Sequence, residues 1–335
     1  MNAPQLFPSA TIGPFGRRQK RERGAKIPVT IVTGFLGAGK TTLIRNFLAA
    51  PEGAGTAVVV NEFGAEGIDN ALLRGSSDET VLLGNGCLCC VMRSDLQIAL
   101  RTLVADRTRG AIPDFKRIVI ETSGLADPSP ILQTFSTDRA LGEEFHVEAL
   151  IAVADAAAGE KTLQWSAEAR KQVILADRLI VTKTDLADAT ALVTRLGALN
   201  PRAAVVTARN GVVDPKHLTD QSAGAASSFV AEATHSDGIG SFVLRPRTLR
   251  WPAFSKAMDT LTALRGPDLL RVKGFLDVEG CQGPILVQFV QHLAHPPVEL
   301  TQWPGADRQS RLVFITRDLP EEKIRALFAA VDALA

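Results

Sequence analysis

The sequence predicts an α/β fold with a mainly parallel, doubly wound sheet, followed by a smaller α+β domain. Short, almost continuously apolar segments alternate with longer helical stretches between residues 27 and 207. This alternation is typical of parallel strands that are buried on both faces. A glycine-rich turn follows the first apolar segment, and the alternation stops after residue 208. A chain of 335 residues has room for two such domains.

The individual elements follow from these patterns in chain order. The first domain is expected to contain strands at residues 27–33, 56–60, 117–121, 148–154, 178–182 and 203–207, and helices at residues 40–50, 94–106 and 160–175. The second domain is expected to contain strands at residues 242–245, 270–278, 285–291 and 311–316, and helices at residues 252–264 and from Glu321 onward. In the last helix Ile324, Leu327, Phe328 and Val331 have the spacing of one apolar face.

Composition divides the chain into four parts. Residues 1–26 carry scattered Pro and Gly and a cluster of basic side chains, which predicts a flexible basic arm. Residues 221–240 are rich in Gly, Ala, Ser and Thr, which is typical of a linker. We therefore expect an arm at 1–26, a first domain at 27–220, a linker at 221–240 and a second domain at 241–335.

Charge and hydropathy restrict the class of partner. The 37 basic and 36 acidic side chains leave a net charge of +1, so no overall charge favours nucleic acid or an anionic membrane. No apolar run approaches the ~18–20 residues that span a bilayer, and the first residues lack the apolar segment of a secretory signal. Three of the four cysteines lie within four positions, which is not the spacing of a disulfide framework. We expect a cytoplasmic protein with neither nucleic acid nor membrane as a partner.

The turn after the first expected strand matches the phosphate-loop pattern G-x-x-x-x-G-K-[ST], in the segment Gly34-Phe35-Leu36-Gly37-Ala38-Gly39-Lys40-Thr41-Thr42. Its glycines let successive backbone N–H groups turn toward one point, and the helix that begins near Lys40 adds the positive end of its dipole. Lys40 is expected to reach the β- and γ-phosphates of a nucleotide, and the Thr41 hydroxyl to bind Mg²⁺. The alternative, a glycine turn with a surface lysine, does not explain the strand before it and the helix after it. The residues expected to hold the nucleotide here are Gly34, Gly37, Ala38, Gly39, Lys40, Thr41 and Thr42.

An acidic residue follows another apolar strand. The segment 118–124 places Glu121 at a strand end and Gly124 three residues later. A carboxylate in this position can hold Mg²⁺ or its water, and the backbone N–H of Gly124 can contact the γ-phosphate. We predict Lys40, Glu121 and Gly124 as catalytic residues, and Thr41 with Glu121 as magnesium ligands. No Gln or Arg stands out as the group that orients water, so slow hydrolysis is expected.

The motif Thr182-Lys183-Thr184-Asp185 indicates which base is bound. The Asp185 carboxylate can accept hydrogen bonds from guanine N1–H and N2–H₂ while the stem of Lys183 packs over the ring. Adenine would leave that carboxylate unpaired at a cost of roughly 1–3 kcal/mol, so the motif favours GTP over ATP. The usual first residue of this motif is Asn, and Thr182 replaces it. In the alternative interpretation, Thr184 or Asp185 caps a helix.

Three cysteines, Cys87, Cys89 and Cys90, lie on a glycine-rich loop before the helix expected at residue 94. Three thiolates suit a soft or borderline ion such as Zn²⁺ or Cu⁺, and a nearby helix N-terminus would lower the thiol pKa values. They leave a tetrahedral ion one ligand short, which suits metal transfer provided that no fourth protein ligand closes the site. The alternatives are a redox pair and small buried side chains. Cys281 stands apart in the second domain and is expected to be buried.

Five motifs in the same chain order resemble those of the CobW-like GTPases, relatives of the nickel-inserting GTPases of urease and hydrogenase maturation. They are the phosphate loop and residues 61–69, 86–90, 121–128 and 182–185. Residues 268–319 are similar to the C-terminal domain of that family, so that the resemblance covers residues 27–335. It implies a metallochaperone that binds GTP with Mg²⁺ and a transition metal, usually zinc or cobalt, and that links slow hydrolysis to metal delivery.

The resemblance also assigns a role to each motif. It implies that Cys87, Cys89 and Cys90 are the metal ligands, and that Lys183 and Asp185 contact guanine. Residues 37–42 would hold the phosphates and Mg²⁺. The implied partner is a client metalloprotein, and either a partner or homodimer formation is expected to accelerate turnover.

Some positions depart from the family pattern. Many members have Glu after the Asn-Glu-Phe-Gly segment, where this chain has Ala65 followed by Glu66, and some have Glu before it, where this chain has Val60. Auxiliary carboxylate metal sites at those positions are therefore not expected. The His-rich stretch of some relatives is reduced to His235 and Asp237, so that metal storage there is not expected either.

The combined prediction is a nucleotide-gated metal carrier. GTP would order residues 61–69 and 123–127 and so change the geometry of the cysteine loop, with a coupling of about 1–3 kcal/mol, or roughly 5–150-fold in metal affinity. Three alternatives stay open: a GTPase that loads an organic cofactor such as cobalamin, a P-loop kinase for small molecules, against which Asp185 argues, and a zinc-binding scaffold without activity. His292 and His295 are either further ligands or ordinary packed or surface histidines.

Overall fold

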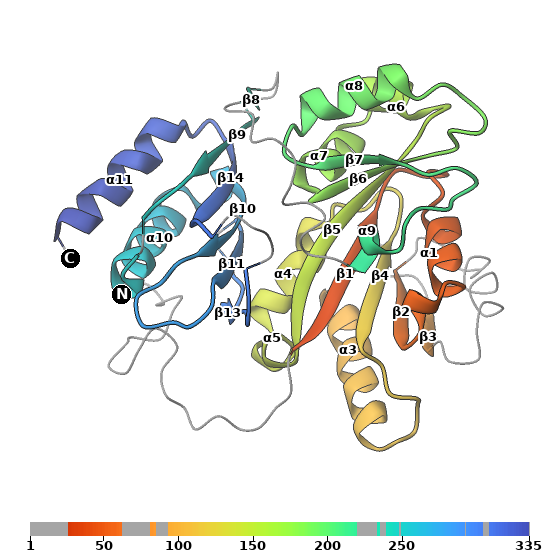
Figure 1. Ribbon diagram of the computed structural model, residues 1–335, viewed down its shortest axis with the longest axis horizontal. Helices are drawn as coiled ribbons and strands as arrows, with labels where there is room; N and C mark the ends of the chain where they lie inside the picture. Colours follow the sequence, from red (N-terminus) through yellow and green to blue (C-terminus); the bar gives the residue numbers. More distant parts are fainter. Residues whose placement is uncertain are drawn as a thin grey trace. The chain divides into compact units, whose positions relative to one another are not determined.

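The computed structural model describes residues 26–61, 81–84, 93–219, 233–234, 239–247, 249–291, 293–303 and 308–334. The chain divides into two compact units, Lys26–Ser228 and Phe229–Ala335, and each is built around its own sheet (Figure 1). The division falls inside the segment expected to be a linker. No helix in the described part of the chain is long and apolar enough to cross a membrane.

The first unit contains a parallel sheet of seven described strands in the order β3-β2-β4-β1-β5-β6-β7. The strands are β1 Ile27–Thr33, β2 Thr56–Asn61, β3 Val81–Gly84, β4 Arg117–Thr122, β5 Phe145–Asp155, β6 Arg178–Thr182 and β7 Ala204–Thr207. Every pair of neighbouring strands is parallel, so that all the carboxyl ends lie at the same edge of the sheet. The central strand β1 lies between β4 and β5 (Figure 1).

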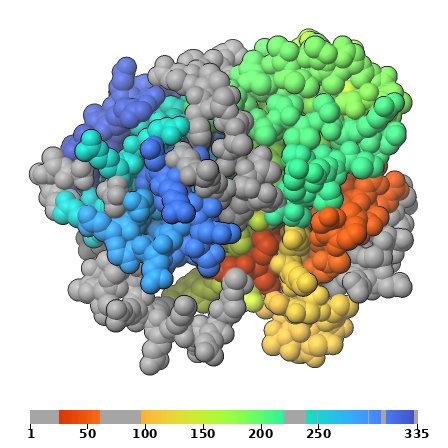
Figure 2. Space-filling model, viewed as in Figure 1, coloured from red at the N-terminus to blue at the C-terminus, as the bar shows by residue number. Residues whose placement is uncertain are grey.

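Helices cover both faces of this sheet. They are α1 Lys40–Leu48, α3 Arg93–Thr108, α4 Ser129–Thr137, α5 Arg139–Glu144, α6 Gly159–Trp165, α7 Ala167–Leu175, α8 Thr190–Leu199 and α9 Lys216–Thr219, with a 3₁₀ turn η1 at Pro51–Gly53. Helices α1 and α9 pack in one apolar cluster with Val153 and Ile180, whereas α6, α7 and α8 pack in another with Ala152 and Leu179. Because successive residues of a strand point to opposite faces, the sheet is doubly wound, which confirms the predicted fold class. The segment from α6 to α9, coloured green, forms one continuous surface in Figure 2.

The helix expected at residues 160–175 is wrong, because two helices, α6 and α7, occupy this stretch. Between them Ser166 has an extended backbone, with φ −92° and ψ 117°, and its hydroxyl accepts the N–H of Ala169 at 3.0 Å. This side-chain cap starts a new helix, α7, one residue after α6 ends. An interruption this short leaves the apolar periodicity almost unchanged, so the sequence pattern did not reveal it.

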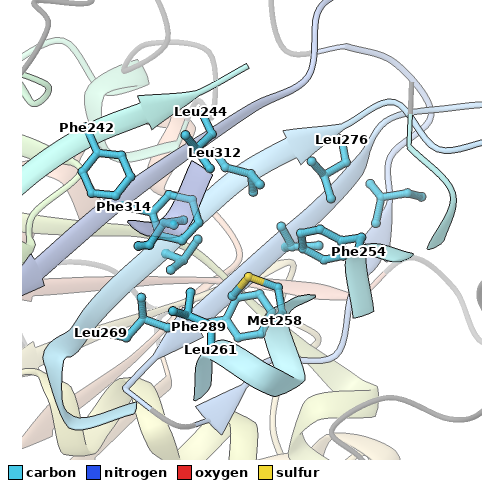
Figure 3. Close-up of a cluster of buried hydrophobic side chains, with 14 of the residues drawn as sticks. Phe242, Leu244, Phe254, Met258, Leu261, Leu269, Leu276, Phe289, Leu312 and Phe314 are labelled. Carbon is cyan, nitrogen blue, oxygen red and sulfur yellow. The ribbon is translucent and has the colours of Figure 1, made fainter. Parts of the chain in front are cut away.

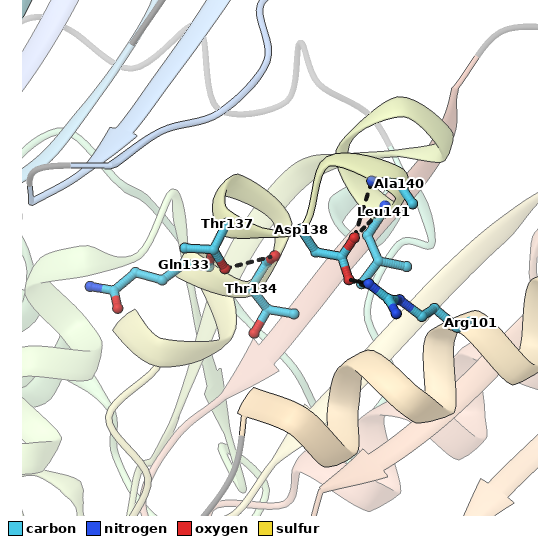
Figure 4. A network of polar contacts seen from close by, with 7 residues as sticks. All are labelled: Arg101, Gln133, Thr134, Thr137, Asp138, Ala140 and Leu141. Carbon is cyan, nitrogen blue, oxygen red and sulfur yellow. Dashed lines mark hydrogen bonds and ion pairs between the residues drawn. The ribbon is translucent and has the colours of Figure 1, made fainter. Parts of the chain in front are cut away.

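Helices α4, α5 and α8 were not among the helix candidates. The first two meet at Asp138, whose Oδ1 accepts the N–H groups of Ala140 and Leu141 at 3.0 and 3.3 Å (Figure 4). Arg101 of α3 donates to Oδ2 of the same carboxylate at 2.7 Å. A cap that also pairs with another helix supports helices too short to be stable on their own.

Lys26 was assigned to the flexible arm, of which the other residues lie outside the described part of the chain. Its ammonium donates to the carbonyl of Gly142 in α5 at 2.7 Å. Burial lowers the pKa of Lys26 below its ordinary value. This lysine is therefore part of the folded first unit rather than of an arm.

The second unit contains an antiparallel sheet in the order β12-β11-β10-β14-β9-β8, with β13 paired to β11. Its strands are β8 Ala233–Thr234, β9 Ile239–Leu244, β10 Leu269–Leu276, β11 Ile285–Val290, β12 Leu293–Ala294, β13 Val298–Glu299 and β14 Arg311–Arg317; its helices are α10 Trp251–Arg265 and α11 Glu321–Leu334, with a 3₁₀ turn η3 at Gly266–Asp268. Strand β8 and the first residues of β9 thus lie inside residues 221–240, the expected linker.

An apolar core joins α10 and α11 to one face of the second sheet. Phe242 and Phe314 stack with ring centroids 5.2 Å apart, and Phe254 and Met258 of α10 point toward the same strands (Figure 3). Ile324 of α11 is fully buried in the cluster. The apolar face predicted for the last helix is therefore the face that packs.

Candidate nucleotide site

The phosphate loop connects the end of β1 to the start of α1. A Cβ on Gly34, at φ +142°, would lie 2.2 Å from the carbonyl oxygen of Val153 in β5, so that only glycine fits there. Gly37 and Gly39 have φ values of +73° and +90°, in the left-handed region that favours glycine. The sequence therefore uses glycine here for close packing as well as for backbone conformation.

Lys40 begins α1 and is only 8% exposed. Its ammonium donates to the carbonyls of Gly34 and Phe35 at 2.9 and 3.3 Å. The side chain thus folds back over the loop and places a positive charge above it. An anion held by the loop would lie within reach of this charge.

Thr41 and Glu121 lie 80 residues apart in the sequence and meet at the carboxyl edge of the sheet. The Thr41 hydroxyl donates to Oε1 of Glu121 at 2.7 Å, and Glu121 pairs with Val32 across β1 and β4. The carboxylate is 4% exposed. A hydroxyl and a carboxylate are hard oxygen donors of the kind that Mg²⁺ prefers, so the residues present fit that ion.

The loop after β4 packs directly against the phosphate loop. A Cβ on Gly124 would lie 2.5 Å from the backbone nitrogen of Leu36, which excludes any other residue without movement. On its other side the loop is bound to α7, because Gln172 donates to the carbonyls of Gly124 and Ala126. The sequence motif identified the glycine but not this support.

Thr182 and Lys183 connect the end of β6 to the phosphate loop and to β5. The Thr182 hydroxyl donates to the carbonyl of Ala38 at 2.6 Å, across 144 positions of sequence. A hydroxyl in place of the usual Asn therefore still ties this motif to the phosphate loop. Lys183 has a left-handed backbone, with φ +57°, and its ammonium lies 2.5 Å from Oδ2 of Asp155 at the end of β5.

Asp185 is exposed, and its Oδ1 accepts the N–H of Asn210 at 2.9 Å. That hydrogen bond lowers the pKa of the Asp185 carboxyl below its ordinary value. Neither Thr184 nor Asp185 caps a helix, because α8 begins at Thr190 and its N-cap is Ala189. The helix-cap interpretation is therefore wrong.

Sequence reasoning missed the loop after β7, residues 208–211. Asn210 and Gly211 both have left-handed backbones, and a Cβ on Gly211 would lie 2.8 Å from Cγ2 of Thr42. The side chain of Asn46 donates to the carbonyl of Asn210 at 3.1 Å. The loop therefore joins Asp185 to α1. An Asn-Gly pair separated by two residues from the end of an expected strand was the available sequence signal.

The site residues that the structure describes gather at one edge of the parallel sheet, beyond the ends of β1, β4, β6 and β7. Open parallel sheets bind ligands at this edge. Residues 62–80 and 85–92, which include Cys87, Cys89 and Cys90, lie outside the described residues, as do His235, Asp237 and His292. Among the residues that the structure describes, no group of three or more His, Cys, Asp or Glu side chains could hold a metal ion.

Two residues of the second unit that the sequence analysis singled out, Cys281 and His295, lie in the described part of the chain. Cys281 is half-buried beside the apolar core, and burial raises the pKa of its thiol above the usual value. His295 is buried, and its backbone N–H donates to the carbonyl of Gln288 at 2.8 Å. Cys281 is thus less buried than expected, whereas His295 is buried, as a packed histidine would be.

Comparisons with known proteins agree with this architecture. Residues 28–207 match the family model described as CobW/HypB/UreG, nucleotide-binding domain, and residues 239–332 match the cobalamin synthesis protein cobW C-terminal domain. The zinc chaperone YjiA of Escherichia coli is 36% identical over 318 residues, which cover 91% of this chain and 98% of YjiA. The zinc chaperone CobW of a Sinorhizobium species is 30% identical over 357 residues, which cover 93% of this chain and 99% of that protein.

A solved structure gives the same result. The crystal structure of the Zn(II)-bound YjiA GTPase from E. coli matches with a TM-score of 0.61 and 33% identity, covering 92% of this chain and 99% of that one. The match extends over nearly the whole of both chains. The chain belongs to the CobW/HypB/UreG family and carries the CobW C-terminal domain.

Proposed function

We propose that this protein is a zinc metallochaperone in which GTP binding and hydrolysis control how tightly the metal is held. The chain is a GTPase of the CobW/HypB/UreG family. The observation that carries the nucleotide half of the proposal is the meeting of Lys40, Thr41 and Glu121 at one edge of the sheet. Relatives along nearly the whole chain are named zinc chaperones, which supports the metal half.

Phosphate binding would use the loop and Lys40. In the structure, the Lys40 ammonium donates hydrogen bonds to the carbonyls of Gly34 and Phe35. We propose that it exchanges these bonds for β- and γ-phosphate oxygens, which form stronger charge-assisted hydrogen bonds. Gly34, Gly37, Ala38, Gly39 and Thr42 would complete the loop around the phosphates.

Magnesium would be held by Thr41 and, directly or through water, by Glu121. The ion supplies positive charge beside the β- and γ-phosphates. The Thr41 hydroxyl would turn its oxygen from Glu121 toward the ion. Gly124 would place its backbone N–H near the γ-phosphate, because its loop touches the phosphate loop at Leu36.

Guanine would be recognised by Asp185, with Lys183 alongside the ring. One oxygen of the carboxylate bonds to Asn210, and Oδ2 is the atom we assign to guanine N1–H and N2–H₂. Adenine offers no such pair of donors. The ion pair with Asp155 would hold the stem of Lys183 in place.

Zinc would be bound by Cys87, Cys89 and Cys90, with cobalt as a second metal that the same motif accepts. The connection that contains these cysteines starts after β3, two strands from β4 in the same sheet. A change in the Gly124 loop on nucleotide binding would alter the metal affinity of this connection. The metal would then pass to a client metalloprotein, and a homodimer or the client would accelerate hydrolysis.

A zinc titration of the full chain against a chromogenic chelator tests this function. The titration is done without nucleotide, with GDP, and with a non-hydrolysable GTP analogue, each with Mg²⁺. We expect the zinc dissociation constant to differ by about 5–150-fold between the analogue and GDP. Equal constants in all three states would contradict the coupling.

The cysteine assignment has its own control. Cys87→Ser should abolish tight zinc binding, whereas Cys281→Ser, which removes the half-buried thiol of the second unit, should leave it unchanged. If both variants bind zinc as the natural protein does, the metal lies elsewhere. GTP hydrolysis that exceeds ATP hydrolysis in the same preparations excludes the small-molecule kinase alternative.

A further inference from the structure

Gln172 of α7 is a buried side chain to which the sequence analysis assigned no role. It is 1% exposed, and its Nε2 donates to the carbonyls of Gly124 and Ala126 at 3.1 and 3.0 Å. These carbonyls lie 48 and 46 positions earlier in the sequence. The amide thus uses both of its hydrogens to fix alternate carbonyls of one loop.

The loop is held between this amide and the phosphate loop. On the far side, a Cβ on Gly124 would lie 2.7 Å from the Cα of Leu36. Gln172 itself lines a small pocket of about 40 Å³ that is also bounded by Gly34 and Phe35. The amide therefore lies behind the phosphate loop, at the place where the two loops meet.

A second attachment joins the next turn of the loop to α7. The ammonium of Lys171 pairs with Oδ2 of Asp127, whose Oδ1 accepts the N–H of Ser129 at the start of α4. Two successive residues of α7 thus hold the loop from residue 124 to residue 127. The helix acts as a fixed support for a segment without regular structure of its own.

A glycine in this position creates a need for such support. Close contact with Leu36 demands a residue without Cβ, but glycine has more backbone freedom than any other residue. The buried hydrogen bond to the Gly124 carbonyl restricts rotation about the Cα–C bond of this residue. Together with the close contact to Leu36 on the other side, it limits how far the N–H of Gly124 can turn. The buried amide of Gln172 therefore offsets the backbone freedom of the glycine that the contact with Leu36 requires.

We propose that Gln172 is a positioning residue that holds the backbone N–H of Gly124 toward the γ-phosphate and so sets the preference of the protein for GTP over GDP. The inference rests on the proposed role of Gly124. It extends that role by naming the side chain that makes the glycine effective. GDP lacks the γ-phosphate, so the amide should contribute little to GDP binding.

Gln172→Met tests the proposal in the full-length protein. Methionine has a similar length and no donor, so the change leaves the two carbonyls without their partner. Dissociation constants are measured for fluorescent GDP and for a fluorescent non-hydrolysable GTP analogue, both with Mg²⁺. We expect the analogue to bind at least about tenfold more weakly, while GDP affinity changes by less than about twofold.

Asn200→Leu is the matched control. Asn200 is also a buried amide, and its Nδ2 donates to the carbonyls of Val173, Ile174 and Ala176 at the C-terminal end of α7 rather than to the Gly124 loop. The variant should lose thermal stability as Gln172→Met does. It should nevertheless keep the natural protein's ratio of affinity for the GTP analogue to affinity for GDP. Equal changes of the ratio in both variants would reduce Gln172 to a general packing role and overturn the proposal.

Lys171→Ala provides a second test if Gln172→Met does not fold. This side chain is one-third exposed, and its removal opens only the attachment at Asp127. The ratio should fall by about two- to fivefold, and an unchanged ratio contradicts the proposal. No zinc is needed, so a failure of metal coupling leaves this measurement intact. If the natural protein binds GDP and the analogue equally, the role of Gly124 fails together with that of Gln172.

Discussion

The two halves of the nucleotide site are built in different ways. The phosphate half, Lys40, Thr41 and Glu121, is formed by side chains on the central strands and on the first turn of α1, and two of these residues are less than one-tenth exposed. The base half, Lys183, Asp185 and Asn210, lies on connections beyond β6 and β7, where Asp185 is exposed. In the proposed site, charge is therefore placed at the edge of the sheet core, whereas base recognition would depend on contacts between loops.

The largest effect is expected in the phosphate half. Lys40→Ala removes the buried ammonium that faces the phosphates and should reduce GTP hydrolysis by about 10²–10³-fold. Hydrolysis is measured by release of inorganic phosphate. Lys161→Ala, which changes an exposed lysine on α6, should have no effect. Comparable losses in the two variants would mean that Lys40 has no special role.

Asp185→Asn tests the base half. The amide can no longer accept two guanine hydrogens, so GTP affinity should fall by about 10–100-fold. Xanthosine triphosphate, which has a carbonyl in place of the N2 amine, should gain affinity because the new amide donates to it. Competition binding of the two nucleotides measures both changes. A loss of affinity for both nucleotides would indicate disrupted folding instead.

The same carboxylate predicts a pH dependence. The Asn210 N–H lowers the pKa of Asp185, so its contribution is present above the ordinary carboxyl pKa and is lost only as the pH falls through the lowered value. Guanine preference should therefore stay constant from about pH 8 to about pH 5. A preference for GTP over ATP that declines across this range would contradict the assignment.

Gly211→Ala tests the contact between the two halves. Alanine at φ +70° is strained, and its Cβ would lie 2.8 Å from Thr42. We expect the free energy of unfolding to fall by about 2–3 kcal/mol, measured by urea denaturation, with weaker nucleotide binding. Gly110→Ala is the control, because Gly110 has φ +67° and open space around it. That variant should lose about 1 kcal/mol and bind nucleotide normally.

The smallest effect is expected at Asn46. Its side chain donates one exposed hydrogen bond to the base-side loop, so Asn46→Ala should weaken GTP binding by about two- to fivefold. Arg45→Ala, on the exposed side of the same helix, should leave affinity unchanged. A loss of the same size in both would assign the effect to the helix rather than to the contact.

Several features of the fold could be predicted from local patterns. The strand at residues 27–33 coincides with β1, and the phosphate loop after it follows the glycine pattern, because both depend on neighbouring residues. The break at Ser166 and the short helices around Asp138 could not be predicted, because a side-chain cap and a partner on α3 decide them. The cysteine motif, the domain boundaries and the role of each site residue stay predictions.

By itself, the sequence determined the alternation of strands and helices, the positions of the glycines and the chemical types of the groups that we propose for phosphate, magnesium and guanine. Only the tertiary structure decided that Thr182 would bond to Ala38, that Asn210 would bond to Asp185, and that Gln172 would hold the Gly124 loop. The physical reason is distance along the chain. These contacts join residues 25 to 144 positions apart, and local periodicity carries no information about which distant backbone groups a side chain will meet.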